Sequence, residues 1–179
     1  MTEPVVAGVS RIAEVLARKR VPLGFATTVA ALVLAQPTWA TWRSGLLIAI
    51  VGEAMRIWAA GHLEKGREVT TSGPYRWTGH PLYVGSSIIA LGVVVGARSL
   101  PVAILAALYM GSTITAAIRT EEAFLRLTFG DAYDRYQQSG GTTARRFSLE
   151  RAMRNREYRA LMGLVAGFAL LALKVVLPI

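Results

Sequence analysis

Apolar residues are gathered along the chain into five long runs separated by polar segments. The runs cover residues 21–42, 44–63, 81–97, 99–118 and 160–179. Each run is close to the roughly 20 residues that an α-helix needs to cross the hydrocarbon core of a bilayer. This pattern predicts an all-α fold: a polytopic membrane protein with about five transmembrane helices and a cytoplasmic helical segment before the last span.

The polar separators indicate how these runs are connected. The sequence GARSLP joins the third and fourth runs, so residues 81–118 are expected to form a helical hairpin with Pro101 in the first turn of its second helix. Residues 1–20 are charged and show no small-residue cleavage site, so the first run is interpreted as a retained span. We expect a single membrane domain over 1–179, divided into a cytoplasmic lead (1–20), four spans (21–118), a polar segment (119–159) and a last span (160–179).

The polar segment 119–159 has its own helical periodicity. In EEAFLRLTFGDAYDRYQQSGG, apolar and aromatic residues recur at helical spacing, and Gly130 is expected to interrupt the helix. The sequence SGGTT is expected to be a loop. RRFSLERAMRNREYRA then predicts a basic helix at the membrane interface that leads into the last span.

Composition supports a membrane protein and narrows its chemistry. The chain is 53% hydrophobic and 17% charged, with a mean hydropathy of +0.42, which is unusually apolar for a soluble protein of 179 residues. It contains no cysteine, which excludes disulfides, cysteine-ligated zinc and thiol catalysis. No metal site is expected.

The basic residues predict the orientation of the chain in the membrane. Sixteen of the 20 Lys and Arg residues fall on the side of the N-terminus and the segment 119–159, whereas Arg43 and Arg98 fall on the other side. The positive-inside rule then predicts a cytoplasmic N-terminus and an external C-terminus. Attraction to anionic membrane lipids accounts for the net charge of +9 without nucleic-acid binding.

One polar stretch, TSGPYRWTGHPLYVG (71–85), runs directly into the third apolar run. Within it, Gly79-His80-Pro81 marks a helix start, because proline fits the first turn of a helix. His80 precedes Ser99 by 19 residues, and Glu121 follows Ser99 by 22. At about 1.5 Å per helical residue, the two lie about 28 and 33 Å from the hairpin turn. We therefore expect His80 and Glu121 at nearly the same depth.

The two sites have complementary electrostatics. The helix start should offer free N–H groups near Leu82, Tyr83 and Val84 and a partial positive charge, which suit a carboxylate. The opposite helix end carries the negative end of its dipole together with Glu121 and Glu122, which suit a cation. A ligand that bridges them would be zwitterionic, and S-adenosylmethionine has a carboxylate, an ammonium and a sulfonium group.

Two motifs in this order, GPYRWTGHPLYVGS and EEAFLRLTFGDAYDRY, resemble the isoprenylcysteine carboxyl methyltransferase family and its phospholipid methyltransferase relatives. That family carries a Gly-Pro-Tyr turn, an Arg-His-Pro-x-Tyr-x-Gly helix start, and a Glu-Glu pair followed by Phe-Gly-x-x-Tyr-x-x-Tyr. The resemblance covers Arg56 to Tyr136, nearly half of the chain. The Arg56-x-Trp58 run and NREYR near Asn155 are similar to bacterial members, which implies a protein of the bacterial cytoplasmic membrane.

The resemblance implies S-adenosylmethionine as methyl donor and a lipid-like or prenylated acceptor, methylated on a carboxylate oxygen or an amine nitrogen. His80 and Glu121 are the expected catalytic residues, since they would be the local bases for an amine acceptor. The family arginine before His-Pro is Gly79 here, and Arg76 could substitute for it. The residues implied to bind the cofactor are Tyr75, Arg76, His80, Pro81, Tyr83, Gly85, Glu121 and Glu122.

Simpler structural roles stay open for several of these residues. His80 could be a helix-start residue without a ligand. Glu122 and Arg126 have the spacing of a surface ion pair, which makes Glu121 the better ligand candidate. Tyr133 and Tyr136 could be interfacial aromatics. Within the second run, Glu53 and Arg56 could form an ion pair that is functional or that ties helices together, and Lys174 is expected to snorkel to the outer interface.

Two other functional classes stay open. A membrane reductase of the sterol-reductase type would bind a nicotinamide cofactor in the polar segment, although a diphosphate favours cations over the Glu121-Glu122 pair. A non-enzymatic membrane scaffold or small transporter gives no reason for His80 and Glu121 to lie at one depth. The acceptor and the oligomeric state are not specified by the sequence.

Overall fold

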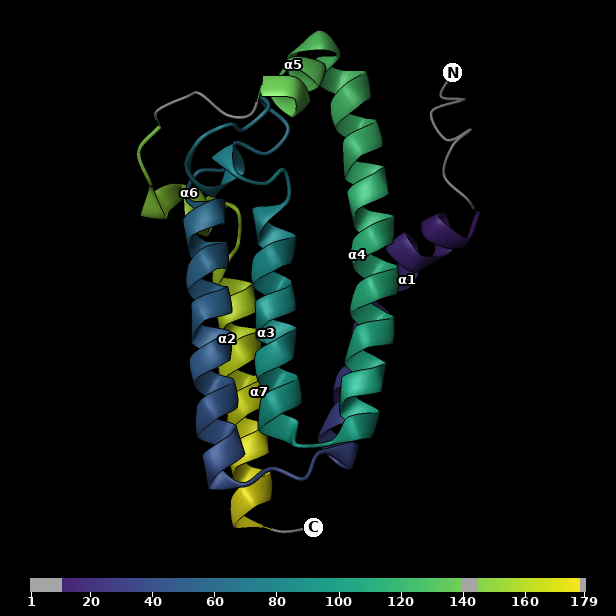
Figure 1. Ribbon diagram of the computed structural model, residues 1–179, viewed down its shortest axis with the longest axis vertical. Coiled ribbons are helices and arrows are strands. Elements are labelled where there is room, and N and C mark those ends of the chain that lie inside the picture. Colours follow the sequence, from purple (N-terminus) through teal and green to yellow (C-terminus); the bar gives the residue numbers. More distant parts are fainter. Residues whose placement is uncertain (1–10, 140–144, 178–179) are drawn as a thin grey trace.

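The computed structural model describes residues 11–139 and 145–177, and these residues form helices without a β-strand. Five long helices make a bundle, and the short elements α5, α6 and η1 cover one end of it, here called the capped end (Figure 1). The all-α prediction is confirmed. The elements are α1 (Arg11–Leu34), α2 (Trp39–Ala60), the 3-10 turn η1 (Gly73–Arg76), α3 (Pro81–Ala97), α4 (Leu100–Phe129), α5 (Asp131–Ser139), α6 (Leu149–Arg154) and α7 (Tyr158–Val176).

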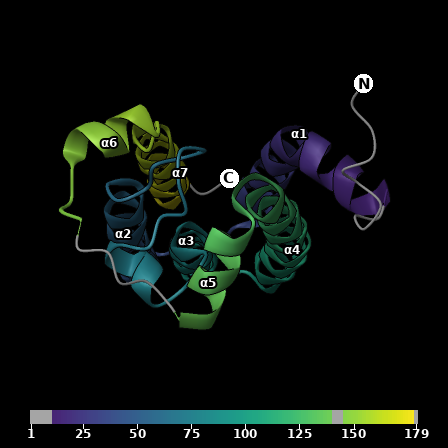
Figure 2. The same ribbon diagram turned by 90° about the horizontal axis from the view of Figure 1, so that it is seen from above.

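The long helices fall into two groups when they are viewed along the bundle. Figure 2 shows α2, α3 and α7 together on one side and α1 with α4 on the other. The residue contacts agree, because α2 packs most closely on α3 and α1 packs most closely on α4. The α3–α4 hairpin of the sequence prediction is present, yet α3 contacts α2 far more than it contacts α4.

Only part of the predicted membrane topology is borne out by helix length and composition. Among the described residues, α4 and α7 are long and apolar enough to cross a bilayer, and α3 and the Pro22–Leu34 part of α1 are shorter apolar helices. The most apolar windows of α4 and α7 are only 11% and 17% buried, whereas a core helix of a soluble protein would be mostly buried. A membrane protein is supported, and the number of five spans stays a prediction.

Two helix boundaries differ from the sequence prediction. The first two runs were divided at residue 43, but α1 ends at Leu34 and α2 already begins at Trp39. Thr38 caps α2, because its hydroxyl accepts a hydrogen bond from the Thr41 N–H while the Thr41 hydroxyl accepts one from the Thr38 N–H. This capping box starts a helix inside an apolar run, where hydropathy alone gives no boundary.

The fourth helix is also longer than predicted. Its apolar run ends at Ile118, but α4 continues to Phe129 and ends at Gly130, whose φ is +44°. Gly130 therefore interrupts the polar helix as predicted, and α5 follows it. Most of the predicted SGGTT loop lies outside the described residues, as do residues 1–10 of the N-terminal lead.

Glycines allow α2 and α3 to approach closely. A Cβ atom on Gly92 would lie 2.6 Å from the Gly45 carbonyl oxygen and 2.7 Å from the backbone nitrogen of Ala49. A Cβ atom on Gly52 would lie 2.7 Å from the Gly85 carbonyl oxygen. Small residues let helix backbones meet in membranes, where the bilayer provides no hydrophobic drive for helices to associate. The register of α3 on α2 is set by these contacts.

Polar side chains tie the remaining helices to this pair. The Trp42 indole N–H donates a hydrogen bond to the Phe168 carbonyl at 2.8 Å and so joins α2 to α7. The Lys174 ammonium, which the sequence predicts to snorkel to the outer interface, donates to the Leu32 and Val33 carbonyls at 2.8 and 2.6 Å. These are among the last carbonyls of α1, which have no partner within their own helix, so Lys174 secures α1 to α7.

We predict that Gly92→Ala destabilises the protein, whereas Gly111→Ala does not. The new methyl group at residue 92 would meet backbone atoms of α2, and overpacking of this kind costs about 1–3 kcal/mol. At Gly111 of α4, a Cβ atom meets nothing within 4 Å, so only the higher helix propensity of alanine should act. Thermal unfolding of both variants in one detergent measures the difference, and equal midpoints would contradict the close α2–α3 contact.

Candidate functional site

The start of α3 is built by a compact turn. Gly73 opens η1 with a φ of +58°, and Pro81 occupies the first turn of α3, where its missing N–H costs nothing. His80 is the N-cap residue, and its carbonyl accepts hydrogen bonds from the N–H groups of Tyr83 and Val84. From the sequence we expected both of these N–H groups to be free for a ligand. This expectation was wrong, and of the three N–H groups at residues 82–84 that of Leu82 alone has no hydrogen-bond partner among the described residues.

The His80 side chain lies between two carboxylates of α4. Its Nδ1 atom is 3.8 Å from Glu121 Oε2, and its Nε2 atom is 3.3 Å from Glu122 Oε1. The prediction that His80 and Glu121 share one depth is therefore confirmed by their contact. The predicted pairing of Glu122 with Arg126 is replaced by the pairing with His80, and Arg126 instead donates a hydrogen bond to the Gln137 side chain at 3.4 Å.

The carboxylates favour the charged form of the imidazole. The nearby Glu121 carboxylate raises the pKa of His80 above its ordinary value, burial opposes this shift, and Glu122 reinforces it. Nδ1 is buried and has no hydrogen-bond partner within normal distance among the described residues. Burial raises the pKa of the Glu121 carboxyl, but its interactions with His80 and the Tyr83 side chain outweigh burial and hold this pKa below its ordinary value. The site thus holds one imidazole and two carboxylates with unused hydrogen-bonding capacity.

A cavity of about 430 Å³ opens beside this cluster, and we call it the polar cavity. The turn, the start of α3, α4 and α5 form part of its wall, and the loop at 63–70 forms the rest. The lining includes five of the residues implied by the family motif, namely Tyr75, His80, Pro81, Tyr83 and Glu121. It also includes residues that were not assigned to the site from the sequence, among them Lys65, Phe124, Tyr133 and Tyr136.

The other predicted site residues lie elsewhere. Arg76 and Glu122 line a second, smaller cavity of about 300 Å³ next to the polar cavity, which His80 and Tyr75 border as well. Gly85 lines neither cavity. A Cβ atom on Gly85 would lie 2.6 Å from Arg56 Cγ, so this glycine permits the contact of α2 with α3 and does not face the site.

Two tyrosines of α5 are part of the site wall. The Tyr136 hydroxyl donates a hydrogen bond to the Tyr75 carbonyl at 2.7 Å, and the Gln137 side chain donates to the Tyr133 hydroxyl at 2.9 Å. Burial raises the pKa of Tyr136, which keeps its hydroxyl a donor. Tyr136 therefore fastens α5 onto the turn before α3, while the hydrogen bond of Tyr133 lies within α5.

The loop wall of the polar cavity is held by the chain's last third. Glu64 accepts hydrogen bonds from Arg151 at 2.7 Å and from Arg154 at 3.2 Å. The Arg151 hydrogen bond holds the pKa of Glu64 below its ordinary value. The Asn155 amide donates to the Ala60 and Leu63 carbonyls, each at 2.9 Å. The polar part of the predicted basic interfacial helix therefore anchors the 61–70 loop.

A buried charge cluster lies below the start of α3. Arg56 Nε is 2.6 Å from Glu157 Oε1 but 3.9 Å from Glu53, so its main partner precedes α7 and is not the neighbour predicted from the sequence. Arg56 Nη1 also donates to the Ser86 hydroxyl and, at 3.4 Å, to the Leu82 carbonyl. One guanidinium thus ties α2, α3 and the start of α7 together.

The second histidine has a structural role that the sequence analysis did not assign. His62 is 4% exposed, and its Nδ1 atom lies 2.9 Å from the Trp58 carbonyl. A Cβ atom on Gly73 would collide with its ring, at 2.6 Å, so His62 packs directly under the η1 turn. Among the described residues, no group of three or more His, Asp or Glu side chains is placed to hold a metal ion.

Three known proteins with sequences similar to this chain are described here, and two of them are named for metal resistance. The chain is 34% identical over 110 residues to the cobalt-zinc-cadmium resistance protein CzcN of Cupriavidus metallidurans. The aligned stretch covers 56% of this chain and 51% of that protein. It is 29% identical over 161 residues to the nickel-cobalt-cadmium resistance protein NccN of Alcaligenes xylosoxydans xylosoxydans, 83% of this chain and 75% of that protein. The chain thus spans about half the length of CzcN and 75% of the length of NccN.

The third relative has an enzymatic name. The chain is 32% identical over 87 residues to the protein-S-isoprenylcysteine O-methyltransferase of Schizosaccharomyces pombe, which covers 49% of this chain and 37% of that protein. No solved structure matches the chain.

A family model gives the broadest agreement. The model of the phospholipid methyltransferases (PEMT) matches residues 25–132, from within α1 to the first turn of α5. This range is more than half of the chain, and it contains the α3 start, both glutamates and most of the wall of the polar cavity. With the His80–Glu121 pairing in place on this helical frame, the chain belongs to the phospholipid methyltransferase family.

Proposed function

We propose that the protein is an S-adenosylmethionine-dependent methyltransferase that modifies a lipid-like acceptor at the membrane. The observation that carries this proposal is the placement of His80 between Glu121 and Glu122 at the edge of the polar cavity. The family membership supports a methyltransferase, and the geometry supports a site for a ligand that carries both signs of charge.

The residues of the polar cavity fit S-adenosylmethionine. Its volume of about 430 Å³ lies in the range of small-molecule sites. Glu121 is 41% exposed and suits the ammonium or sulfonium group, while Lys65 suits the carboxylate. Aromatic side chains suit both the adenine ring and a cation, and the cavity wall provides Tyr75, Phe124, Tyr133 and Tyr136.

When bound, S-adenosylmethionine supplies an electrophilic methyl group for in-line displacement by the acceptor. The protein's task is to align the two reactants at about 3–3.5 Å and to exclude water. A carboxylate acceptor needs no base. For an amine acceptor, Glu121 is the better base, because the raised pKa of His80 favours an imidazolium that has no lone pair to accept a proton.

The proposed orientation places the capped end of the bundle in the cytoplasm. A water-soluble methyl donor then reaches the polar cavity from that side, and an apolar acceptor approaches from the bilayer. The alternative of a nicotinamide-dependent reductase predicts a cation-rich diphosphate site, whereas the carboxylates of Glu121 and Glu122 flank His80 at the edge of the polar cavity.

The proposed function is tested by labelled methyl transfer. Purified protein is incubated with methyl-labelled S-adenosylmethionine and a membrane lipid extract, and the products are identified by mass analysis. Calorimetric titration with S-adenosylmethionine and with a nicotinamide dinucleotide separates the two cofactor classes. Binding of the dinucleotide without binding of S-adenosylmethionine would overturn the proposal.

We predict that Glu121→Gln weakens S-adenosylmethionine binding more than Glu122→Gln. Glu121 lines the polar cavity, whereas Glu122 lines the smaller neighbouring one. Loss of one charge-assisted contact costs about 1.5–3 kcal/mol, which is roughly ten- to a hundredfold in affinity. Calorimetry on both variants makes the comparison, and an equal or larger loss at Glu122 would assign the methyl donor to the other cavity.

We predict a pH-dependent contribution of His80 to stability. Because its folded-state pKa is raised above the ordinary value of 6.5, the charged imidazole stabilises the folded protein fully below that value. The contribution is lost as the pH rises through the folded-state pKa. The gap in thermal midpoint between the parent protein and His80→Gln should therefore be largest at acidic pH and close at alkaline pH, and a gap that does not change with pH would contradict this assignment.

A further inference from the structure

The loop between α2 and η1 presents a lysine to the polar cavity. Residues of this loop between 63 and 70 form part of the cavity wall. The Arg67 N–H donates a hydrogen bond to the Glu64 carbonyl at 3.2 Å, which closes a four-residue turn. Gly66, whose φ is +71°, stands at the third position of this turn. The turn therefore places Lys65, its second residue, beside the cavity, which Lys65 lines.

Lys65 and Glu121 give the polar cavity a charge of each sign. Lys65 comes from the loop and Glu121 comes from α4, and both residues line the cavity. Burial raises the pKa of the Glu121 carboxyl, its hydrogen-bonding neighbours lower it, and the positive charge of Lys65 adds to the lowering. The lysine is thus close enough for its charge to act on the carboxylate. A zwitterionic ligand in this cavity has an opposite charge available for each of its own charged groups.

The loop is held in place by residues 145–155, which we call the clamp segment. Figure 2 shows α6, the helical part of this segment, at the outer edge of the capped end, and α6 packs on α2. The Arg151 guanidinium donates hydrogen bonds to the Glu64 carboxylate at 2.7 Å and to the Gly61 carbonyl at 2.5 Å. The Ser148 N–H donates to the same carbonyl at 3.1 Å. The loop is thus fastened from the point where it leaves α2.

The clamp segment also pairs with both carboxylates of the loop. Arg154 Nη2 lies 3.2 Å from each of the Glu64 carboxylate oxygens. Arg145 Nη2 lies 2.6 Å from Glu68 Oε1. The residues of the clamp segment do not line the polar cavity, so these ion pairs hold the loop from outside it. The carboxylates that flank Lys65 in the chain are therefore paired with arginines, which leaves the lysine charge to the cavity.

One of these ion pairs contributes more than the others. The side chains of Arg151 and Glu64 are only 15% and 17% exposed, whereas those of Arg154 and Glu68 are 50% and 45% exposed. Ion pairs that face solvent are screened and contribute little to stability. Most of the hold on the loop therefore comes from the Arg151–Glu64 pair and from the Asn155 hydrogen bonds described above.

We propose that the clamp segment positions Lys65 to bind the carboxylate of the methyl donor, with Glu64 and Arg151 as positioning residues. This inference rests on the proposed function and adds the source of the site's selectivity for a carboxylate. A loop that is ordered before the ligand arrives loses less conformational entropy on binding, so the lysine contact yields more affinity. The clamp segment lies beyond residues 25–132, the range that the family model matches.

The selectivity is measured by calorimetric titration of the full chain with S-adenosylmethionine and with decarboxylated S-adenosylmethionine. The parent should bind S-adenosylmethionine at least about tenfold more tightly, the difference expected for one hydrogen bond to a charged group. Lys65→Met should lose most of this preference, because methionine keeps an apolar stem without the ammonium. A parent without the preference, or Lys65→Met with the full preference, overturns the inference.

Glu64→Gln tests the positioning role, because it removes the charge that pairs with Arg151 and leaves Lys65 in place. The preference for S-adenosylmethionine should fall by about threefold or more, while the affinity for the decarboxylated compound stays near that of the parent. In a Lys65→Met background, Glu64→Gln should cause no further loss of preference. A purely structural role would lower the thermal midpoint or weaken both ligands alike, and an unchanged preference overturns the inference.

Glu150→Gln is the matched control, since Glu150 is an exposed carboxylate of α6 that does not line the polar cavity. It should bind both compounds as the parent does. Tryptic cleavage after Arg67 reports on the loop without any ligand, and it should be faster in Glu64→Gln than in Glu150→Gln. Equal cleavage rates in the two variants would mean that the Arg151–Glu64 pair does not hold the loop, which overturns the positioning role.

The same titrations separate this inference from the proposed function. If the parent binds neither compound, the proposed function fails and the inference fails with it. If the parent binds S-adenosylmethionine but Glu64→Gln keeps the full preference, the inference fails alone. If Glu64→Gln does not fold, Arg151→Lys replaces it, because lysine keeps the charge but lacks the planar fork that joins Glu64 to Gly61. Its preference should fall in the same way, and a full preference overturns the inference.

Discussion

The close approach of α2 to α3 is the constraint on which the rest of the structure depends. Glycines on both helices leave room for backbone against backbone, and any side chain at Gly92 or Gly52 would occupy the partner's space. The same approach lets Arg56 of α2 reach beneath the first turn of α3, past Gly85. The glycine contacts and the Arg56 hydrogen bonds therefore fix the start of α3 together, and with it the position of His80.

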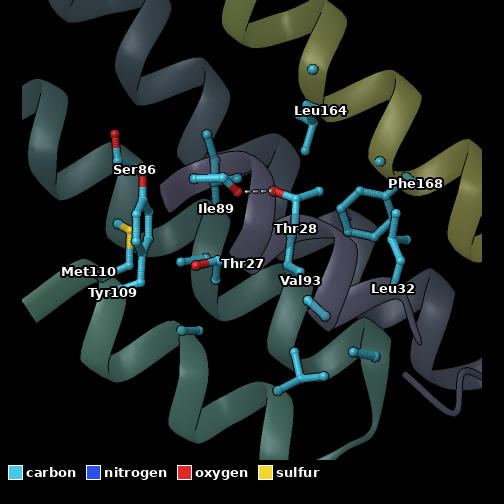
Figure 3. A pocket seen from close by; sticks show the side chains of 18 of the residues that line it. Thr27, Thr28, Leu32, Ser86, Ile89, Val93, Tyr109, Met110, Leu164 and Phe168 are labelled. Carbon is cyan, nitrogen blue, oxygen red and sulfur yellow. Dashed lines mark hydrogen bonds between the residues drawn. The ribbon is translucent and has the colours of Figure 1, made fainter. Parts of the chain in front are cut away.

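The position of His80 then organises the charges around it. The α3–α4 turn returns the chain so that Glu121 and Glu122 meet the imidazole, although α3 and α4 touch little along their length. This divergence leaves space between the helix groups, and a cavity of about 460 Å³ with a mostly apolar lining from α1, α3, α4 and α7 lies there (Figure 3). A polar cavity and an apolar one thus result from one arrangement, in which α3 packs along α2 and meets α4 at the hairpin turn and at His80.

Local signals in the sequence were sufficient for the α3–α4 hairpin and for the His80–Glu121 contact. Two prolines mark helix starts, and the two uncharged runs between the motifs fix helical distances that can be counted from the turn at Arg98 and Ser99. The boundary between α1 and α2 was predicted at the wrong residue, because Thr38 and Thr41 form a capping box inside an apolar run. The end of α4 was predicted too early for the opposite reason. Charged residues after Ile118 end the apolar run, but the Glu, Arg and Leu residues of this stretch are good helix formers and continue the helix.

The partners of the charged residues inside the helices could not be predicted from the sequence. An arginine such as Arg56 in an apolar helix requires a partner, and the nearest carboxylate in the sequence, Glu53, was the natural candidate. Glu53 does lie within ion-pair distance of Arg56, at 3.9 Å, but the closer partner is Glu157 at 2.6 Å. Glu157 is 101 positions away, and only the packing of α7 against α2 brings the two together. Glu53 itself is 3% exposed, and its oxygens have no hydrogen-bond partner among the described residues. The need for a partner can be read from the sequence, but its identity is a property of the fold, because burial makes the charge costly while helix packing alone decides which group is near.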